Sequence, residues 1–138
     1  MSTSYRAAFT SDFRNASLAR KSIASFASVC GFTESEVADI RLAAGEALGN
    51  AVEHGRSARS SGFSVRCTFA DDELIIEIRD NGHGFSAILS DAAPPPGRQR
   101  GLGIFLMRQL MDQVTYAHNG TLVRMARKRH VEALEQRA

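Results

Sequence analysis

The chain has 138 residues, of which 43% are hydrophobic and 23% charged, and its formal net charge is only +2. This composition is typical of one globular domain, expected over residues 1–138, and gives no argument for direct nucleic-acid binding. No apolar run approaches the roughly 18 residues of a membrane span. The N-terminus lacks a signal-peptide core and the two cysteines lack metal-ligand spacing, so we expect a cytoplasmic protein with reduced thiols.

The first part of the chain is predicted to form a short edge strand and a helix. The strand covers residues 4–10, and the helix runs from 13 to 30 with Ser11 or Asp12 as its N-cap. Gly31 ends the helix as a left-handed C-terminal cap. Helical spacing points four apolar side chains toward the core: Leu18, Ile23, Phe26 and Val29.

A second helix is predicted from a capping box of Thr33 and Glu36 to about His54. Glu46, Asn50 and His54 recur every fourth residue and so form one polar stripe along this helix. The residues around the stripe are small or apolar: Leu42, Ala43, Ala44, Ala47, Leu48, Ala51 and Val52. The helix should therefore be buried, and polar groups on a buried face must be paired or must serve a ligand.

Two predicted hairpins supply most of a sheet. Residues 63–69 alternate apolar and polar side chains, and residues 74–79 follow them across an Asp-Asp turn. The second hairpin pairs residues 114–118 with 121–126 across an Asn-Gly pair, a strong signal for a type I′ turn.

Between the hairpins, a surface loop over residues 86–100 leads into a helix that opens with Gly101-Leu102-Gly103. The basic residues near the end of the chain are predicted to be solvated surface, and the last dozen residues to form a frayed, charged helix. Together these elements predict an α+β fold with two layers: a mixed, mainly antiparallel sheet with helices on one face.

The sequence Asp80-x-Gly82-x-Gly84 follows a buried strand. A carboxylate fixed there can accept a hydrogen bond from an exocyclic amine, and the glycines let the backbone approach a flat ligand closely. Taken alone, the motif is more often a simple Asn-Gly turn. The acidic residues that a calcium loop needs at alternate positions are absent.

The glycines at 101 and 103 open a helix, where free amides and the helix dipole favour phosphate. A plain helix start is the commoner meaning of such a pair, and the sequence is neither a Walker A loop nor a Rossmann fingerprint. In the polar stripe, the Asn50 amide oxygen suits Mg²⁺, and Glu46 can accept a proton from an attacking hydroxyl. His54 more often caps or packs than takes part in chemistry.

The order of these motifs resembles that of the GHKL (Bergerat) ATPase family of histidine kinases, gyrase and Hsp90. Its E-x-x-x-N helix motif matches Glu46 to Asn50, its D-x-G-x-G motif matches Asp80 to Gly84, its lid matches residues 86–100, its phosphate-side glycines match Gly101 and Gly103, and its adenine-side threonine matches Thr121. The resemblance covers nearly the whole chain and implies the fold of that family.

Within the family, the segments GEALGNAVEHG, GLGIFLMRQLMDQVTY and GTLVRM look like those of the stand-alone anti-sigma-factor serine/threonine kinases. No histidine precedes the polar-stripe helix as a phosphoacceptor, and no transducer domain is expected after it. The resemblance implies ATP and Mg²⁺ as cofactors. It also implies a sigma factor and an anti-anti-sigma (STAS) protein as partners, and a homodimer.

The resemblance further implies a role for each site residue. Asn50 holds Mg²⁺, Glu46 is the base, and Asp80 with Thr121 binds adenine. The remaining nucleotide contacts come from Gly82 and Gly84, from Arg98 or Arg100 in the lid, and from the backbone of Gly101, Leu102 and Gly103. Two alternatives remain: a module that holds ATP and sequesters a sigma factor without phosphotransfer, and a serine kinase that acts on another regulatory partner.

Overall fold

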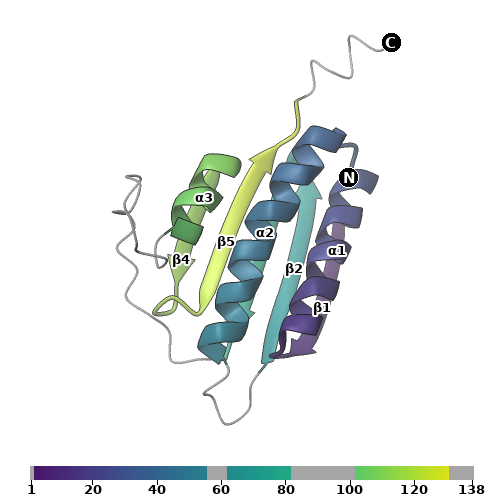
Figure 1. Ribbon diagram of the computed structural model, residues 1–138. Helices are drawn as coiled ribbons and strands as arrows, with labels where there is room; N and C mark the ends of the chain where they lie inside the picture. Colours follow the sequence, from purple (N-terminus) through teal and green to yellow (C-terminus); the bar gives the residue numbers. More distant parts are fainter. Residues whose placement is uncertain (1, 56–61, 82–101, 131–138) are drawn as a thin grey trace.

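The computed structural model describes residues 2–55, 62–81 and 102–130 (Figure 1). Within these ranges it contains eight elements: β1 (Thr3–Thr10), α1 (Phe13–Val29), α2 (Glu34–Gly55), β2 (Gly62–Ala70), β3 (Glu73–Asp80), α3 (Leu102–Leu110), β4 (Gln113–Ala117) and β5 (Leu122–Lys128). None of the helices in these ranges has the length and apolar character that a membrane span requires.

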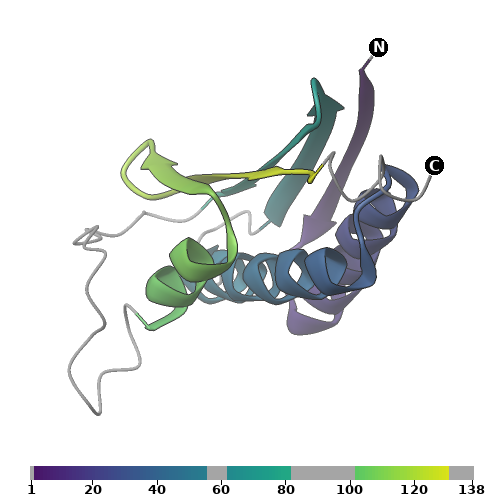
Figure 2. The ribbon, with the colours of Figure 1, turned by 90° about the horizontal axis from the view of Figure 1, so that it is seen from above.

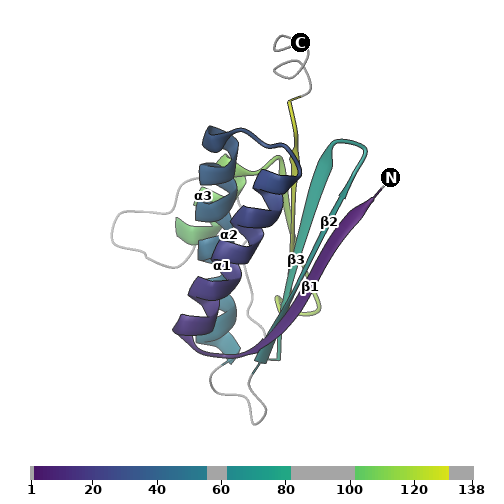
Figure 3. The ribbon, with the colours of Figure 1, turned by 90° about the vertical axis from the view of Figure 1, so that its right-hand side faces the viewer.

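The strands form one five-stranded sheet in the order β1-β2-β3-β5-β4. Every pair of neighbouring strands in it is antiparallel. All three helices lie on the same face, with α2 between α1 and α3 (Figures 1 and 2), and the view along the sheet edge shows the two layers separately (Figure 3). The predicted two-layer α+β fold is confirmed.

The core lies between α2 and the middle of the sheet. On β3 the alternate side chains Leu74, Ile76 and Ile78 are fully or almost fully buried, as the alternation in the sequence predicts. The facing side of α2 consists largely of buried alanines, so the helix can lie close to the strands. Close packing over the central strands fixes the position of α2, and with it the polar stripe, relative to the end of β3.

On α1, the predicted core face is only partly right. Ile23 is buried, but Leu18 is 50% exposed and Val29 is 83% exposed. The buried positions form a narrower stripe of mostly small residues: Ala16, Ala19, Ile23 and Ala27. Leu18 and Val29 each follow a buried alanine by two positions, a rotation of roughly 200° around the helix, and therefore face outward. On α2, Leu42 is likewise exposed rather than buried.

The predicted helix ends are confirmed. Asp12 caps α1 by accepting a hydrogen bond from the Asn15 amide at 2.8 Å. Thr33 and Glu36 form the capping box of α2, with hydrogen bonds of 3.0 and 3.2 Å. Gly31 has a φ of +94°, a left-handed conformation that glycine adopts without strain. These caps set the angle at which the chain turns from α1 into α2.

The predicted Asn119-Gly120 turn between β4 and β5 is present: both residues have a positive φ, 57° and 84°, and the Thr121 amide donates to the His118 carbonyl at 3.1 Å. A second turn overlaps it one residue earlier, with His118 (φ 53°) and Asn119 at its centre and the Gly120 amide donating to the Ala117 carbonyl at 3.1 Å. Thr121 therefore belongs to the loop, and β5 begins at the next residue.

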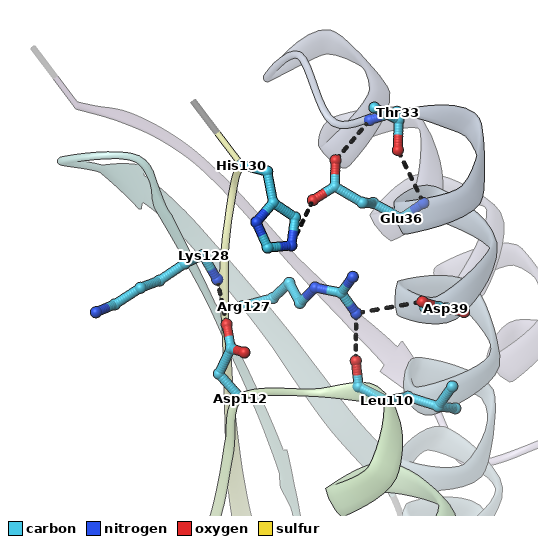
Figure 4. A network of polar contacts seen from close by, with 8 residues as sticks. All are labelled: Thr33, Glu36, Asp39, Leu110, Asp112, Arg127, Lys128 and His130. Atoms are coloured by element: carbon cyan, nitrogen blue, oxygen red, sulfur yellow. Dashed lines mark hydrogen bonds and ion pairs between the residues drawn. The ribbon is translucent and has the colours of Figure 1, made fainter. Parts of the chain in front are cut away.

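The basic run at the end of β5 is not simply solvated surface. Arg127 is 13% exposed; it forms an ion pair with Asp39 of α2 at 3.4 Å and donates to the Leu110 carbonyl at the end of α3 (Figure 4). The Lys128 amide donates to the Asp112 carboxylate at 2.6 Å. The strand thus continues into the region predicted to be a frayed helix and joins α2 to α3. Residues 131–138 of that prediction lie outside the described residues.

Arg129, the residue that follows β5, joins two turns. It donates to the Cys30 carbonyl at 2.6 Å and to the Asp72 carboxylate, and its guanidinium lies 5.0 Å from the centre of the Phe69 ring. The side chain is 23% exposed. It therefore connects the α1–α2 turn to the β2–β3 turn.

Replacing Arg129 by alanine is expected to lower the free energy of unfolding by about 2 kcal/mol, because a carbonyl and a carboxylate lose a charged donor. Urea denaturation measures the change. Arg124→Ala is the matched control, since Arg124 lies exposed on β5, and its effect is expected to stay within about 0.5 kcal/mol. Equal losses in the two variants would contradict a structural role for Arg129.

Candidate functional site

A narrow pocket opens between α2 and the part of the sheet formed by β3, β5 and β4. Its lining residues come from four segments: Ala47, Asn50, Ala51, Ile78, Asp80, Tyr116, Gly120, Thr121 and Val123. Three residues predicted from separate motifs, Asn50, Asp80 and Thr121, thus meet at one place. A larger hollow lies on the helix-free face of the sheet, and none of the predicted site residues lines it.

Asp80 is the last residue of β3 and is only 7% exposed. Its backbone amide donates to the Thr121 carbonyl at 2.8 Å, so the end of the strand is fastened to the loop before β5. The Thr121 hydroxyl donates to the His118 carbonyl at 2.7 Å, which leaves its lone pairs to accept from a ligand. A carboxylate and a hydroxyl oxygen that both accept suit the exocyclic amine of adenine.

Glu46 and Asn50 lie one turn apart on α2, and the first turn of α3 packs against them. A side-chain carbon built on Gly103 would lie 2.8 Å from Glu46 Oε2 and 3.8 Å from Asn50 Nδ2. Only glycine fits there without displacing the carboxylate. The free amides and positive dipole end at the start of α3 therefore lie next to the polar stripe, an arrangement that favours phosphate.

The residues present fit Mg²⁺ held mainly by a nucleotide. Among the described residues, no group of three or more His, Cys, Asp or Glu side chains could hold a metal ion by itself. Mg²⁺ keeps several waters and commonly takes only one or two protein ligands beside phosphate oxygens. The side-chain amide of Asn50, which lies beside the start of α3, can supply one such oxygen.

The other predicted site residues divide into two groups. His54 is half-buried near the end of α2 and does not line the pocket, and Leu102 begins α3 with an exposed side chain. The predictions for Gly82, Gly84, Arg98, Arg100 and Gly101, and for the lid over residues 86–100, fall outside the described residues.

Tyr116 of β4 is a pocket residue that the motif analysis missed. Burial raises the pKa of its hydroxyl to about 12. The nearby Asn50 side chain and the Arg108 charge act in the opposite direction and lower this pKa, but by less. The alternation of β4, in which Val114 also points inward, could have placed Tyr116 on the helix-facing side. Alternation alone gives no sign that this side faces Asn50.

Comparison with known proteins identifies relatives of this arrangement. Residues 9–127 match the family described as the histidine kinase-like ATPase domain. The chain is 32% identical over 111 residues to an anti-sigma F factor of Clostridium acetobutylicum, covering 77% of this chain and 78% of that protein. It is 31% identical over 129 residues to an anti-sigma F factor of Clostridium botulinum, covering 87% and 90%.

A solved structure shares the fold. The RsbU and RsbW domains of a Mycobacterium tuberculosis protein superpose with a TM-score of 0.61 at 16% identity. The match covers 93% of this chain and 32% of that longer chain. At this identity the likeness concerns the fold alone.

Proposed function

Because the chain belongs to the histidine kinase-like ATPase family, we propose that it binds ATP with Mg²⁺ in the pocket beside α2. We further propose that it is an anti-sigma factor that phosphorylates a serine or threonine of an anti-anti-sigma (STAS) protein. The names of the relatives similar over most of the chain support the anti-sigma role. The protein would act in the cytoplasm as a homodimer, and light scattering of the purified chain tests the dimer.

The observation that carries the proposal is the convergence of separate motifs on one pocket. Asp80 and Thr121 supply acceptors at one end, and Asn50 lies on the wall between that end and the start of α3. Glu46 stands beside Gly103, where phosphate would lie. Their arrangement supports a bound ATP molecule with its adenine at Asp80 and Thr121, its metal ion at Asn50, and its phosphates between Glu46 and the start of α3.

Each group has a distinct task in binding. Asp80 accepts a hydrogen bond from the adenine amine, with Thr121 beside it as a second acceptor. The amides at the start of α3 bind phosphate oxygens, and Arg98 or Arg100 neutralises charge on the transferred group. Asn50 would hold Mg²⁺, which when bound neutralises negative charge on the phosphates.

The chemical step transfers one phosphoryl group. The hydroxyl oxygen of the acceptor attacks the γ-phosphorus, and the bond from that phosphorus to the bridging oxygen breaks. ADP leaves with the bonding electrons, and the hydroxyl proton passes to the Glu46 carboxylate. A protein that only stored ATP would need no carboxylate in this position, which favours the kinase over the non-catalytic alternative.

Incubation with radiolabelled ATP, Mg²⁺ and a STAS-domain protein tests the function. We expect label on the STAS protein, located on a serine or threonine by mass spectrometry, and co-purification of a sigma factor with the unlabelled chain. Nucleotide binding without label would support the sequestering module. Label on a different partner would support a kinase outside sigma control. Absence of ATP binding in calorimetry would contradict all three functions.

A further inference from the structure

The face of the sheet that the helices leave open is strongly basic. All three helices of the described residues lie on the other face (Figures 2 and 3). By the alternation of the strands, the open face carries more basic than acidic side chains: Arg6, Arg66, Arg79, Arg124 and Lys128 against Glu73 and Glu77. This excess of positive charge is larger than the net charge of +2 of the entire chain. The charge of the protein is therefore unevenly distributed, with the positive excess on this face.

A hollow of about 460 Å³ lies within the open face. The small side chains of Ala8 and Ser64, opposite each other on β1 and β2, form its floor. The next outward pair along these two strands is Arg6 and Arg66. Arg79 lies opposite Ser64 on β3. Neighbouring positions of this kind are about 5–8 Å apart. Three guanidinium groups therefore border one hollow with a small, partly polar floor.

Arg6, Arg66 and Arg79 are not paired within the described part of the chain. None of the three side chains takes part in an ion pair or a hydrogen bond there, and all three residues are exposed. Arg6 and Arg66 are directly opposite each other, and like charges in this position destabilise a sheet. An acidic group bound between these two side chains would remove their repulsion, and it can reach them without any change in the fold.

We propose that this hollow is a docking site for an acidic segment of a protein partner, whose carboxylates bind Arg6, Arg66 and Arg79. Guanidinium groups bind carboxylates through two parallel hydrogen bonds, which fix the orientation of the acidic group as well as its position. The hollow lies on the opposite face of the sheet from the pocket beside α2, and no residue lines both. The inference therefore does not depend on ATP binding.

Glu77 favours a protein segment over other anions. In the register of the sheet it lies between Arg66 on β2 and Arg124 on β5. A nucleic-acid backbone carries a negative charge at every phosphate and would be repelled at Glu77. A protein segment can place a neutral or basic side chain there and carboxylates on either side. A second copy of the chain is a poor occupant, because a two-fold interface would bring two identical arginine-rich surfaces together.

The test measures binding of a short synthetic peptide with glutamate at alternate positions, labelled with a fluorophore, by fluorescence anisotropy. Arg66→Gln keeps a long polar side chain but removes its charge. We expect this variant to bind the peptide about tenfold more weakly, because a neutral amide replaces a guanidinium that binds carboxylate. Absence of binding by the wild type, or equal affinity in the variant, would overturn the inference.

Arg41→Gln is the matched control. Arg41 lies exposed on α2, in the helical layer, so the same chemical change is made away from the hollow. Peptide affinity should stay at the wild-type value. Equal losses in Arg41→Gln and Arg66→Gln would overturn the inference, because they would show a general response to net charge.

A loss of binding through misfolding would have a different signature. Because Arg66→Gln removes the repulsion from Arg6, urea denaturation should give a free energy of unfolding equal to or above that of the wild type. Amide NMR spectra of the wild type provide an independent measurement. The peptide should shift the amides around Ala8 and Ser64 and leave that of Asn50 unchanged. Shifts confined to other elements would overturn the inference.

Two further measurements distinguish the other occupants. At physiological salt the peptide is expected to bind more tightly than a short DNA duplex, since Glu77 opposes the phosphates. Tighter binding of the duplex would overturn the assignment to a protein partner. Light scattering should give the same oligomeric state for the wild type and Arg66→Gln. A change in that state would overturn the inference as well, because it would show that this face joins copies of the chain.

Discussion

Glu46→Gln is expected to lower the rate of phosphoryl transfer by about 100-fold or more. The glutamine keeps the shape of the side chain beside Gly103 but cannot take the proton of the acceptor hydroxyl at neutral pH. ATP affinity should stay near the wild-type value, because Asp80, Thr121 and the start of α3 are unchanged. Single-turnover transfer to the STAS protein measures the rate, and calorimetry measures the affinity.

Glu53→Gln is the matched control for this experiment. Glu53 lies on α2 two turns after Glu46, carries the same charge and is exposed. Its replacement should leave the transfer rate close to that of the wild type. Transfer by Glu46→Gln at the wild-type rate would remove the role of base from Glu46. Equal losses in both variants would point to a general effect of charge on α2.

Most of the fold could be predicted because the sequence marks its own element boundaries. Asp12, Thr33 and Glu36 cap helices through local hydrogen bonds, and Gly31 supplies a conformation that few other residues adopt easily. Which face of α1 is buried was harder to predict. Periodicity gives the spacing of the buried positions on a helix but not which of the possible stripes is buried. We chose the stripe with large apolar side chains, which includes Leu18, whereas α1 packs mainly through its alanines.

Part of the site could be predicted and part could not. Glu46 and Asn50 share a face because of helix geometry alone, and Asp80 stands at the end of an obvious strand. The contact between Asn50 and Tyr116 depends on how β4 is placed beside β5 and under α3, and no local pattern contains that information. The ion pair of Arg127 on β5 was missed for the same reason, since its partner Asp39 is 88 residues away in the sequence.

Asp80→Asn is expected to weaken ATP binding by about 10–100-fold, because a buried charged acceptor for the adenine amine is replaced by a neutral amide. Binding of GTP should not fall in the same way. Guanine carries a carbonyl oxygen where adenine carries its amine, and the new amide can donate to that oxygen. The preference of the protein for ATP over GTP should therefore shrink. Calorimetry with both nucleotides, in the wild type and the variant, gives the ratio.

Asp71→Asn provides the control for Asp80→Asn, since it makes the same chemical change at an exposed turn. Asp71 has a φ of 53°, a conformation that asparagine also tolerates, so the fold should be unaffected. Its preference for ATP should equal that of the wild type. If Asp80→Asn remains folded and keeps the wild-type preference, the carboxylate does not recognise adenine. Recognition would then have to come from Thr121 and the backbone around it, and Thr121→Val would become the variant that lowers the preference, because valine keeps the shape but lacks the accepting oxygen.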